Sequence, residues 1–467
     1  MAKEISNKKE IFETMPVTKA VASMAGPTII SQLVHLIYNI ADTFFVGRTG
    51  NSYMIASMSV TSTIYLLCIA FANLFGVGGG SLIARLKGRG EDIHARAVSA
   101  FSIWGGILLP VLYAVIIGVF MNPILYFLGA SDQSIPFARQ YCIYVIILGG
   151  IPIVDSLVAA HILRNVGYAK KASFGLSLGA VLNMALDPLF MFVLLPEGCE
   201  VMGAAIATTL SNWICTIYLF VQMHKVSEVE HLSLKLSDIR KIRKRDVKDL
   251  LTVGIPSALL SGLLDVTQIV QTKLMSTYGD LSVAAIGLAG KMERLPNSIN
   301  LGISQGALPI IAYNYSSGNK KRMNETIKVS AGIGICVSIV SIVLLIIFAK
   351  PFASFFISTS GRQAVNVTET IALAATFLSI RCIQSPFSFI NHMITVVMQG
   401  VGFGKSTLVQ AFVKNIVFLI PFMYIFNGLW GAQGIAGAIP AAEFLGCIFG
   451  IFFVRYLFKR EEKLLQH

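Results

Sequence analysis

Polar side chains recur on one face of an otherwise apolar segment near the start of the chain. His35, Tyr38, Asn39 and Asp42 follow each other at helical intervals, so they share one helix face. A charged group at the centre of a bilayer costs about 3 kcal/mol on insertion scales, so this face must contact protein or water. His35 is a predicted cavity residue, and Asp42 is a predicted ion-binding residue unless it only caps or pairs locally. Pro27 removes a helical hydrogen bond earlier in the segment and is the predicted hinge.

A second polar pair lies in a later apolar stretch. Asn183 and Asp187 are four residues apart, so they also share a helix face. Two carboxyl groups and an amide that converge would suit exchange of a proton, and the same oxygens would suit Na⁺, which is a hard cation. Thr208 would add a hydroxyl group, although a hydroxyl bonded to its own helix is an equal alternative. The predicted ion-coupling residues are Asp42, Asp187, Asn183, Thr208, Tyr38 and Asn39, and the Na⁺ ligands among them would be Asp42, Asn183 and Asp187.

Charged residues also fall inside apolar segments of the second half of the chain. Asp265 and Gln268 share one stripe, and Glu293, Arg294 and Arg381 lie in two further segments. Charges in such positions pair with each other. We expect Asp265 and Glu293 to form a network with Arg294 or Arg381 that lines a cavity and contacts a ligand or locks one state. A purely structural ion-pair cluster is the alternative.

The elements that carry these residues are predicted to be membrane-spanning helices. The chain has 467 residues, of which 55% are hydrophobic and only 13% are charged, whereas about one quarter of the residues are charged in soluble domains. The apolar residues form runs long enough for helices of about 20 residues that cross a bilayer. The alternating segments of a β-barrel are not seen. We predict an all-α integral membrane protein with about twelve transmembrane helices.

The net charge of +13 is distributed over alternate loops. Lys and Arg cluster at residues 85–96, 164–171, 235–248, 320–322 and 455–460, whereas the loops between these clusters are poor in both. This positive-inside pattern predicts a multi-pass protein of a bacterial or archaeal cytoplasmic (inner) membrane, with both termini in the cytoplasm. Because topology accounts for the charge, the lipid bilayer is the predicted partner and nucleic acid is not.

The chain contains two similar halves. Gly-Pro-Thr at residues 26–28 and Ile-Pro-Ser at residues 255–257 each begin a predicted span, and the same offset pairs Asp42 with Gln271. We divide the chain into an N-lobe (residues 1–225), a basic cytoplasmic linker (226–247) and a C-lobe (248–467). Two parallel six-helix bundles predict a pseudo-twofold axis along the membrane normal, a central cavity and alternating access. A channel or a scaffold is the alternative for such a duplicated bundle.

Three motifs carry a resemblance to a known family. Residues 38–48 read YNIADTFFVGR, residues 164–170 read RNVGYAK and residues 183–188 read NMALDP. In this order they resemble the MATE (multidrug and toxic compound extrusion) transporters over nearly the whole chain, in the branch with acidic residues in the N-lobe. The resemblance implies a monomer that exports small organic cations in exchange for H⁺ or Na⁺, without a cofactor. The tenth helix lacks the acidic residue that some MATE branches carry there, which favours coupling in the first half.

Two other functions are alternatives to export. A flippase for lipid-linked precursors, from the same superfamily, would need a more cationic cavity, for which Lys291, Arg294 and Arg381 are candidates. Asp42 and Asp187 instead favour a cationic substrate. The sequence contains no HExxH motif and no paired catalytic carboxylates in a loop, so we predict no enzymatic activity. Gly-Lys-Ser at residues 404–406 lacks the first glycine of a P-loop, so an ion gradient rather than ATP is the predicted energy source.

Overall fold

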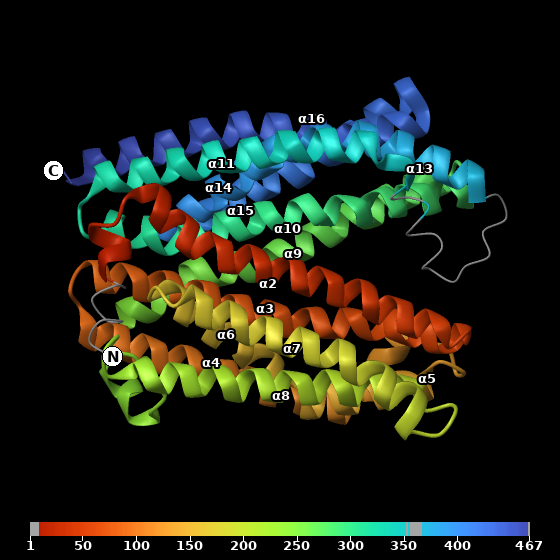
Figure 1. Ribbon diagram of the computed structural model, residues 1–467, viewed down its shortest axis with the longest axis horizontal. Coiled ribbons are helices and arrows are strands. Elements are labelled where there is room, and N and C mark those ends of the chain that lie inside the picture. The colour runs from red at the N-terminus through yellow and green to blue at the C-terminus, as the bar shows by residue number, and fades with distance from the viewer. Residues whose placement is uncertain (1–8, 352–353, 355–366, 466–467) are drawn as a thin grey trace.

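The computed structural model describes residues 9–351, 354 and 367–465, which form helices and contain no strand (Figure 1). Short 3₁₀ or π-helical turns, labelled η, interrupt several of the helices. In the first half the elements are α2 (Val17–Arg48), α3 (Ser52–Gly88), α4 (Asp92–Phe127), α5 (Ile135–Tyr141), η1 (Cys142–Leu148), α6 (Gly150–Asn165), α7 (Ala169–Leu189), η2 (Phe190–Leu194) and α8 (Glu200–Ser227). The linker contains η3 (Leu236–Lys241). In the second half they are α9 (Lys244–Ser276), α10 (Asp280–Ser316), α11 (Lys320–Ile347), α13 (Val367–Arg381), η4 (Cys382–Gln384), α14 (Ser385–Val401), α15 (Gly404–Phe412), η5 (Val413–Leu419) and α16 (Ile420–Leu465).

The described helices account for the predicted number of spans. Nine helices are long and apolar enough to cross a membrane, and the bent pair Ile135–Leu148 and Gly150–Asn165 makes a tenth span. α10 is equally long but carries several charged residues, which lower its hydropathy. The run Gly404–Lys463 has 60 residues, about three times the length needed for one crossing. It breaks at Gly431, where φ is 60° and ψ is −139°. Counting α10 and two spans in this run gives twelve.

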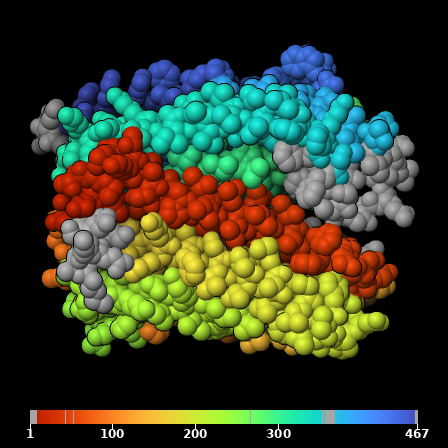
Figure 2. Space-filling view, in the orientation of Figure 1, coloured from red at the N-terminus to blue at the C-terminus, as the bar shows by residue number. Residues whose placement is uncertain are grey.

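The helices form two bundles that lie side by side. α2 to α8 make one bundle and α9 to α16 make the other, and both chain ends lie at the same end of the molecule (Figure 1). In the space-filling view α2 runs along the boundary between the bundles, with α7 on one side and α11 on the other (Figure 2). The predicted topology puts the end with the termini in the cytoplasm.

Small residues bring the two bundles together at the end nearest the termini. α2 packs on α10, and α3 packs on α9. A Cβ atom added to Gly306 of α10 would lie 2.6 Å from Cα of Ala25, and one added to Gly302 would lie 2.7 Å from Cα of Ile29. Gly254 of α9 approaches the backbone of α3 in the same way. Only glycine allows backbones to approach this closely, so the lobes are closed against each other at this end.

Ion pairs hold the linker against the N-lobe. Lys87 pairs with Glu230 at 2.5 Å, and the Arg96 guanidinium donates to Asp238 at 3.0 Å. Ser233 also donates to the Asp238 carboxylate, at 2.6 Å. The hydrogen bonds from Ser233 and Arg96 favour the charged form and lower the pKa of Asp238 to about 2. The basic linker is therefore a docked segment rather than a free tether.

Candidate functional site

The polar stripe of α2 faces the interior of the N-lobe. The rings of His35 and Tyr38 are in contact, with centroids 5.6 Å apart, and both side chains line a partly open cavity. Asn39 donates a hydrogen bond to the carbonyl oxygen of His35, at 2.8 Å. Asp42 lies one turn beyond Tyr38, in the half of α2 farther from the termini, and is half-buried. The stripe thus runs from the cavity toward the opposite end of the molecule.

Asp187, Asn183 and Thr208 form a buried hydrogen-bonded cluster between α7 and α8. In the orientation of the Asn183 amide in which both its nitrogen and its oxygen form hydrogen bonds, the nitrogen donates to Asp187 Oδ2 at 2.9 Å. Its oxygen accepts from the backbone N–H and the hydroxyl group of Thr208, at 3.0 and 3.2 Å. The neighbouring Thr209 bonds instead to backbone carbonyls, including that of Ala205 on its own helix. Thr208 therefore belongs to the cluster, and Thr209 has the packing role.

One oxygen of this cluster is left without a partner. Asp187 is fully buried, and within the described residues its Oδ1 atom accepts no hydrogen bond. Asp187 is close enough to Asp42 for the two carboxyl groups to interact electrostatically. Tyr38 and Tyr141 interact electrostatically with both of these carboxyl groups. A buried carboxylate oxygen without a donor is costly. A proton or a small cation at this atom would remove that cost.

A cavity of about 230 Å³ lies next to the cluster. Its lining comes from α2, α3, α6, α7 and α8 of the N-lobe, and Gln305 of α10 reaches it from the other lobe. His35, Tyr38, Asn183, His161 and Arg164 are among the polar side chains that line it. The cavity thus combines apolar walls with several polar groups, lies in the N-lobe and touches the interface between the lobes.

Two arginines that the sequence placed in basic loops are buried at the interface between the lobes. Arg164, at the end of α6, donates to Gln305 at 3.3 Å, and Gln32 of α2 donates to the same oxygen at 3.3 Å. Arg85 donates to the carbonyl oxygens of Gln399 and Gly400 in the C-lobe, at 3.1 and 3.3 Å. The loop assignment was wrong for both residues, because each lies on the last turn of a helix that packs on the other lobe.

Three further polar residues of the apolar segments have different surroundings. These residues are His161 and Asp155 of α6 and His392 of α14. His161 lines the N-lobe cavity, and His392 Nδ1 lies 2.8 Å from the carbonyl oxygen of Ser388. Asp155 is fully buried against Gly106 of α4, and among the described residues neither of its carboxylate oxygens has a hydrogen-bond partner. Asp155 is therefore not a satisfied core group.

The C-lobe contains one part of the predicted charge network. Arg381 donates two hydrogen bonds to Glu293, at 2.9 and 2.8 Å, and Gln384 donates a third at 3.1 Å. Arg381 also lies 3.5 Å from Gln271, the residue that the repeat pairs with Asp42. Arg294 is exposed and is not in this network, so the partner of Glu293 is Arg381.

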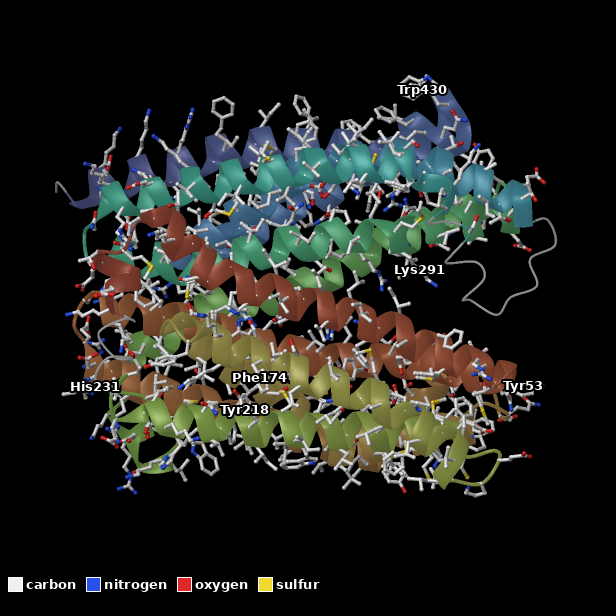
Figure 3. All side chains as sticks on the ribbon, viewed as in Figure 1. Tyr53, Phe174, Tyr218, His231, Lys291 and Trp430 are labelled. Atoms are coloured by element: carbon white, nitrogen blue, oxygen red, sulfur yellow. The ribbon has the colours of Figure 1, made fainter. Side chains whose placement is uncertain are left out.

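Other polar residues predicted in the C-lobe have different positions. Gln268 is exposed on α9, and the side chain of Asp265 is outside the described residues. Lys291 projects from α10 on the side that faces α2 (Figure 3). Within the described side chains, the part of the predicted network that is seen is the pair of Glu293 and Arg381 with Gln384.

A second buried polar cluster in the C-lobe was missed. Lys414 of η5 pairs with Glu443 of α16 at 2.7 Å. Asn391 of α14 donates to Glu443 at 2.7 Å and accepts from Gln410 of α15 at 2.9 Å. The only sequence signal was a single charge in each of two apolar runs. Its donors and acceptors are matched to one another, which is the pattern of a structural network.

The predicted hinge lies inside an unbroken helix. α2 continues through Pro27, although proline cannot donate the usual helical hydrogen bond to Ser23. A Cβ atom on the preceding Gly26 would meet nothing within 4 Å, so this side of the helix has room to bend. Ala25 and Ile29, on either side of the proline, are among the residues of α2 that touch α10. Bending at Pro27 would therefore alter the contact between the lobes.

Comparisons with known proteins agree with this architecture. A family model described as MatE matches residues 27–189 and 256–425, and the two matches begin at the two prolines that mark the repeat. The multidrug export protein MepA of Staphylococcus haemolyticus is 30% identical over 449 residues, which cover 95% of this chain and 94% of that protein. MepA of Staphylococcus saprophyticus is 28% identical over 452 residues, which cover 96% and 95%.

A solved structure shares the whole fold. It is an outward-facing conformation of a multidrug resistance MATE family transporter of the MOP superfamily. It superposes with a TM-score of 0.88 at 24% identity and covers 96% of this chain and 97% of that chain. This likeness confirms the predicted fold class of two helical lobes.

Proposed function

The chain belongs to the MatE family of membrane transporters, and from this premise we propose that it exports amphipathic organic cations in exchange for H⁺ or Na⁺. The observation that carries the proposal is the partnerless Oδ1 atom of buried Asp187, held beside Asp42 and the N-lobe cavity. The names of the MepA relatives support multidrug export. The protein acts as a monomer in a bacterial inner membrane and has no enzymatic activity.

The coupling step is a competition for the two N-lobe carboxyl groups. Asp42 and Asp187 are negative when empty, so they attract a cationic substrate toward the cavity, where the rings of His35 and Tyr38 offer it aromatic faces. A proton or Na⁺ arriving at Asp187 neutralises that charge and lowers the affinity for the substrate. Asn183 and Thr208 hold the Asp187 carboxylate in place for the incoming ion.

Alternating access follows from the contacts between the lobes. The lobes are packed together at the end with the termini, and on this proposal the cavity exchanges with the opposite side in this arrangement. Separation at α2–α10 and α3–α9 would expose it to the cytoplasm. Pro27 is the hinge of this movement, because its neighbours form the contact.

The flippase reading has weaker support. It relied on Lys291, Arg294 and Arg381 as a cationic cavity for a pyrophosphate. The Arg381 charge is neutralised by Glu293, and Asn183, which lines the N-lobe cavity, donates to the Asp187 carboxylate. We therefore favour a cationic substrate over an anionic one.

Ethidium efflux from energised everted vesicles tests the proposal. Wild type is measured beside Asp42→Asn and Asp187→Asn, with the proton and sodium gradients collapsed separately. Glu197→Gln, in an exposed loop, is the control for loss of one carboxylate. We expect each Asp variant to lose efflux at least tenfold, the cost expected for one charge-assisted interaction, and the control to keep it. Wild type without cation efflux would overturn the exporter, and efflux by both Asp variants would overturn the assigned site.

A further inference from the structure

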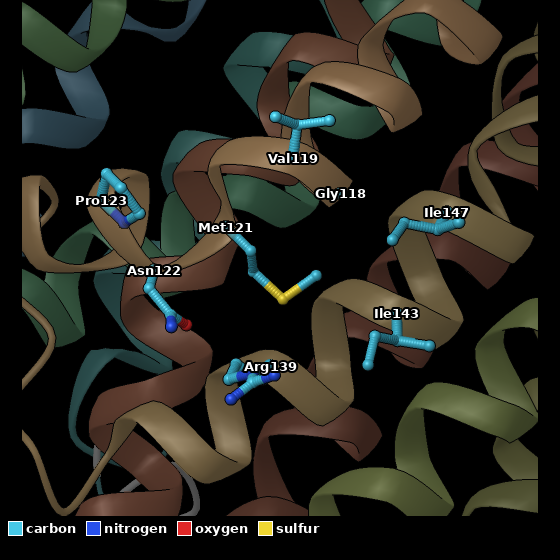
Figure 4. Close-up of a pocket in the computed structure, with 8 residues that line it drawn as sticks. All are labelled: Gly118, Val119, Met121, Asn122, Pro123, Arg139, Ile143 and Ile147. Carbon is cyan, nitrogen blue, oxygen red and sulfur yellow. The ribbon is translucent and has the colours of Figure 1, made fainter.

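A groove of about 380 Å³ lies on the surface of the N-lobe, and none of the proposed ion-coupling residues lines it (Figure 4). It is formed by the end of α4 and by α5 with η1. Val119, Met121, Ile143 and Ile147 give it apolar walls, and Asn122 lies with Arg139 toward the other end. Val119 is 69% exposed, so this surface faces the lipid.

The backbone itself creates the groove. α4 loses helical geometry at Phe120, where φ is −108° and ψ is 24°, and Pro123 follows one turn later. Opposite, η1 is a wider π-helix, and the segment that contains it is bent by 48° from α6. A Cβ atom on Gly118 would meet only Ile147 Cδ1, at 3.8 Å. The hollow is therefore built into two irregular helices and is not a chance gap between side chains.

Arg139 is the unexplained residue of this groove. It is exposed on α5, and its guanidinium makes no ion pair or hydrogen bond with the residues that the structure describes. The nearby Asp132 accepts from Tyr126 at 2.7 Å. A guanidinium beside apolar membrane-facing walls needs an anionic partner, and phosphate fits its planar donors well.

The two ends of the groove lie at different depths. α5 begins at Ile135, next to the loop, so Arg139 lies one turn inside the membrane surface. Ile147 is eight residues further on, which corresponds to about 12 Å of helix rise. The polar end thus lies at the level of the headgroups, and the apolar end points toward the bilayer centre. This order matches the order of groups in a phospholipid.

We propose that this groove binds a glycerophospholipid with a net negative headgroup. Arg139 pairs with the phosphate, and Asn122 donates to an adjacent headgroup oxygen. One acyl chain follows Ile143 and Ile147. The predicted topology puts this lipid in the outer leaflet, since the groove lies at the end opposite the termini. The site is independent of the proposed transport reaction.

Native mass spectrometry of the purified full chain tests this site. The delipidated protein is mixed with phosphatidylglycerol or phosphatidylcholine, and the bound fraction is measured for matched pairs of variants. Arg139→Gln is compared with Lys350→Gln, which removes an exposed cation at the same end of the molecule. Gly118→Leu, which fills the groove and keeps Arg139, is compared with Gly332→Leu, where a side chain meets nothing within 4 Å.

We expect wild type to prefer phosphatidylglycerol, and Arg139→Gln and Gly118→Leu each to bind it about tenfold less tightly than their controls. Equal binding of the two lipids by wild type would overturn the proposed preference for a net negative headgroup. Unchanged binding in Arg139→Gln would show that Arg139 does not pair with the phosphate, and would overturn the proposed site. Loss in Arg139→Gln without loss in Gly118→Leu would place the lipid outside the groove and overturn the proposal.

Discussion

The contact between α2 and α10 offers a way to weaken one arrangement of the lobes without touching the proposed ion site. In Gly306→Ala the new Cβ would lie 2.6 Å from Cα of Ala25 and 2.7 Å from its nitrogen. Both are backbone atoms, which cannot rotate away as the end of a flexible side chain could, so one helix has to shift. Overpacking of this kind costs about 1–3 kcal/mol.

This cost falls on one state only. The clash exists where α2 and α10 are packed together, and it disappears when the lobes separate at this end. A difference of about 1–3 kcal/mol changes the ratio of two states about 5- to 150-fold. Gly287→Ala on the same helix is the matched control, because a Cβ atom there meets nothing within 4 Å.

Pulsed electron paramagnetic resonance between spin labels on the two lobes measures the populations of the closed and the separated arrangement. Suitable label positions are Lys170 and Lys321, exposed residues of the two lobes near the termini, in a background without the seven native cysteines. We expect the longer distances to gain population in Gly306→Ala but not in Gly287→Ala. The same distance distribution in both variants would refute the idea that the α2–α10 contact holds the lobes closed.

Two further predictions concern charged contacts. Glu293→Ala should lower the thermal unfolding midpoint, because loss of the partner of a buried charge such as Arg381 costs about 3–5 kcal/mol. Adding Arg381→Ala should recover part of the loss, and an unchanged midpoint in the single variant would contradict the buried pair. Asp238→Asn should loosen the linker. Its folded-state pKa of about 2 lies below the usual value of about 3.9, so its stabilising effect is complete above the usual value and is lost as the pH falls toward 2. Pepsin should therefore cut the wild-type linker faster as the pH falls from about 4 to about 2, and Asp238→Asn should already be cut fast at pH 4; equal cutting of both at pH 4 would count against this contact.

The spacing of apolar and polar residues predicted the helices and the pairing of Asn183 with Asp187 on α7. Asn183 and Asp187 could be paired from their spacing, because residues four apart on a helix must share a face. Their relation to Thr208 depended on how two separate helices pack, and the structure supplies it. The role of these residues in coupling stays a prediction.

The residues whose surroundings the sequence did not predict have a common cause: the sequence does not show which neighbours a side chain meets. Glu293 and Arg294 are neighbours on α10 and point about 100° apart, so Arg294 could not share the site of Glu293. Sequence alone also could not separate Arg164, buried at a helix end, from the exposed Lys170 that follows it. Lys414 and Glu443 come together only because two helices are adjacent in space. Spacing along one helix predicts which residues share a face, but not what that face meets.

The closed pair of Glu293 and Arg381 also bears on what powers a transport cycle. Two opposite charges that neutralise each other carry no net charge across the membrane, so on the proposed mechanism Asp42 and Asp187 limit the cycle to two coupling ions. Exchange of two such ions for one monovalent cation moves one net charge inward. A membrane potential of 100 mV then contributes about 2.3 kcal/mol, which supports a roughly 50-fold difference in substrate concentration. Export by this protein would be electrogenic, and depolarising the membrane would slow it even where the ion gradient is intact.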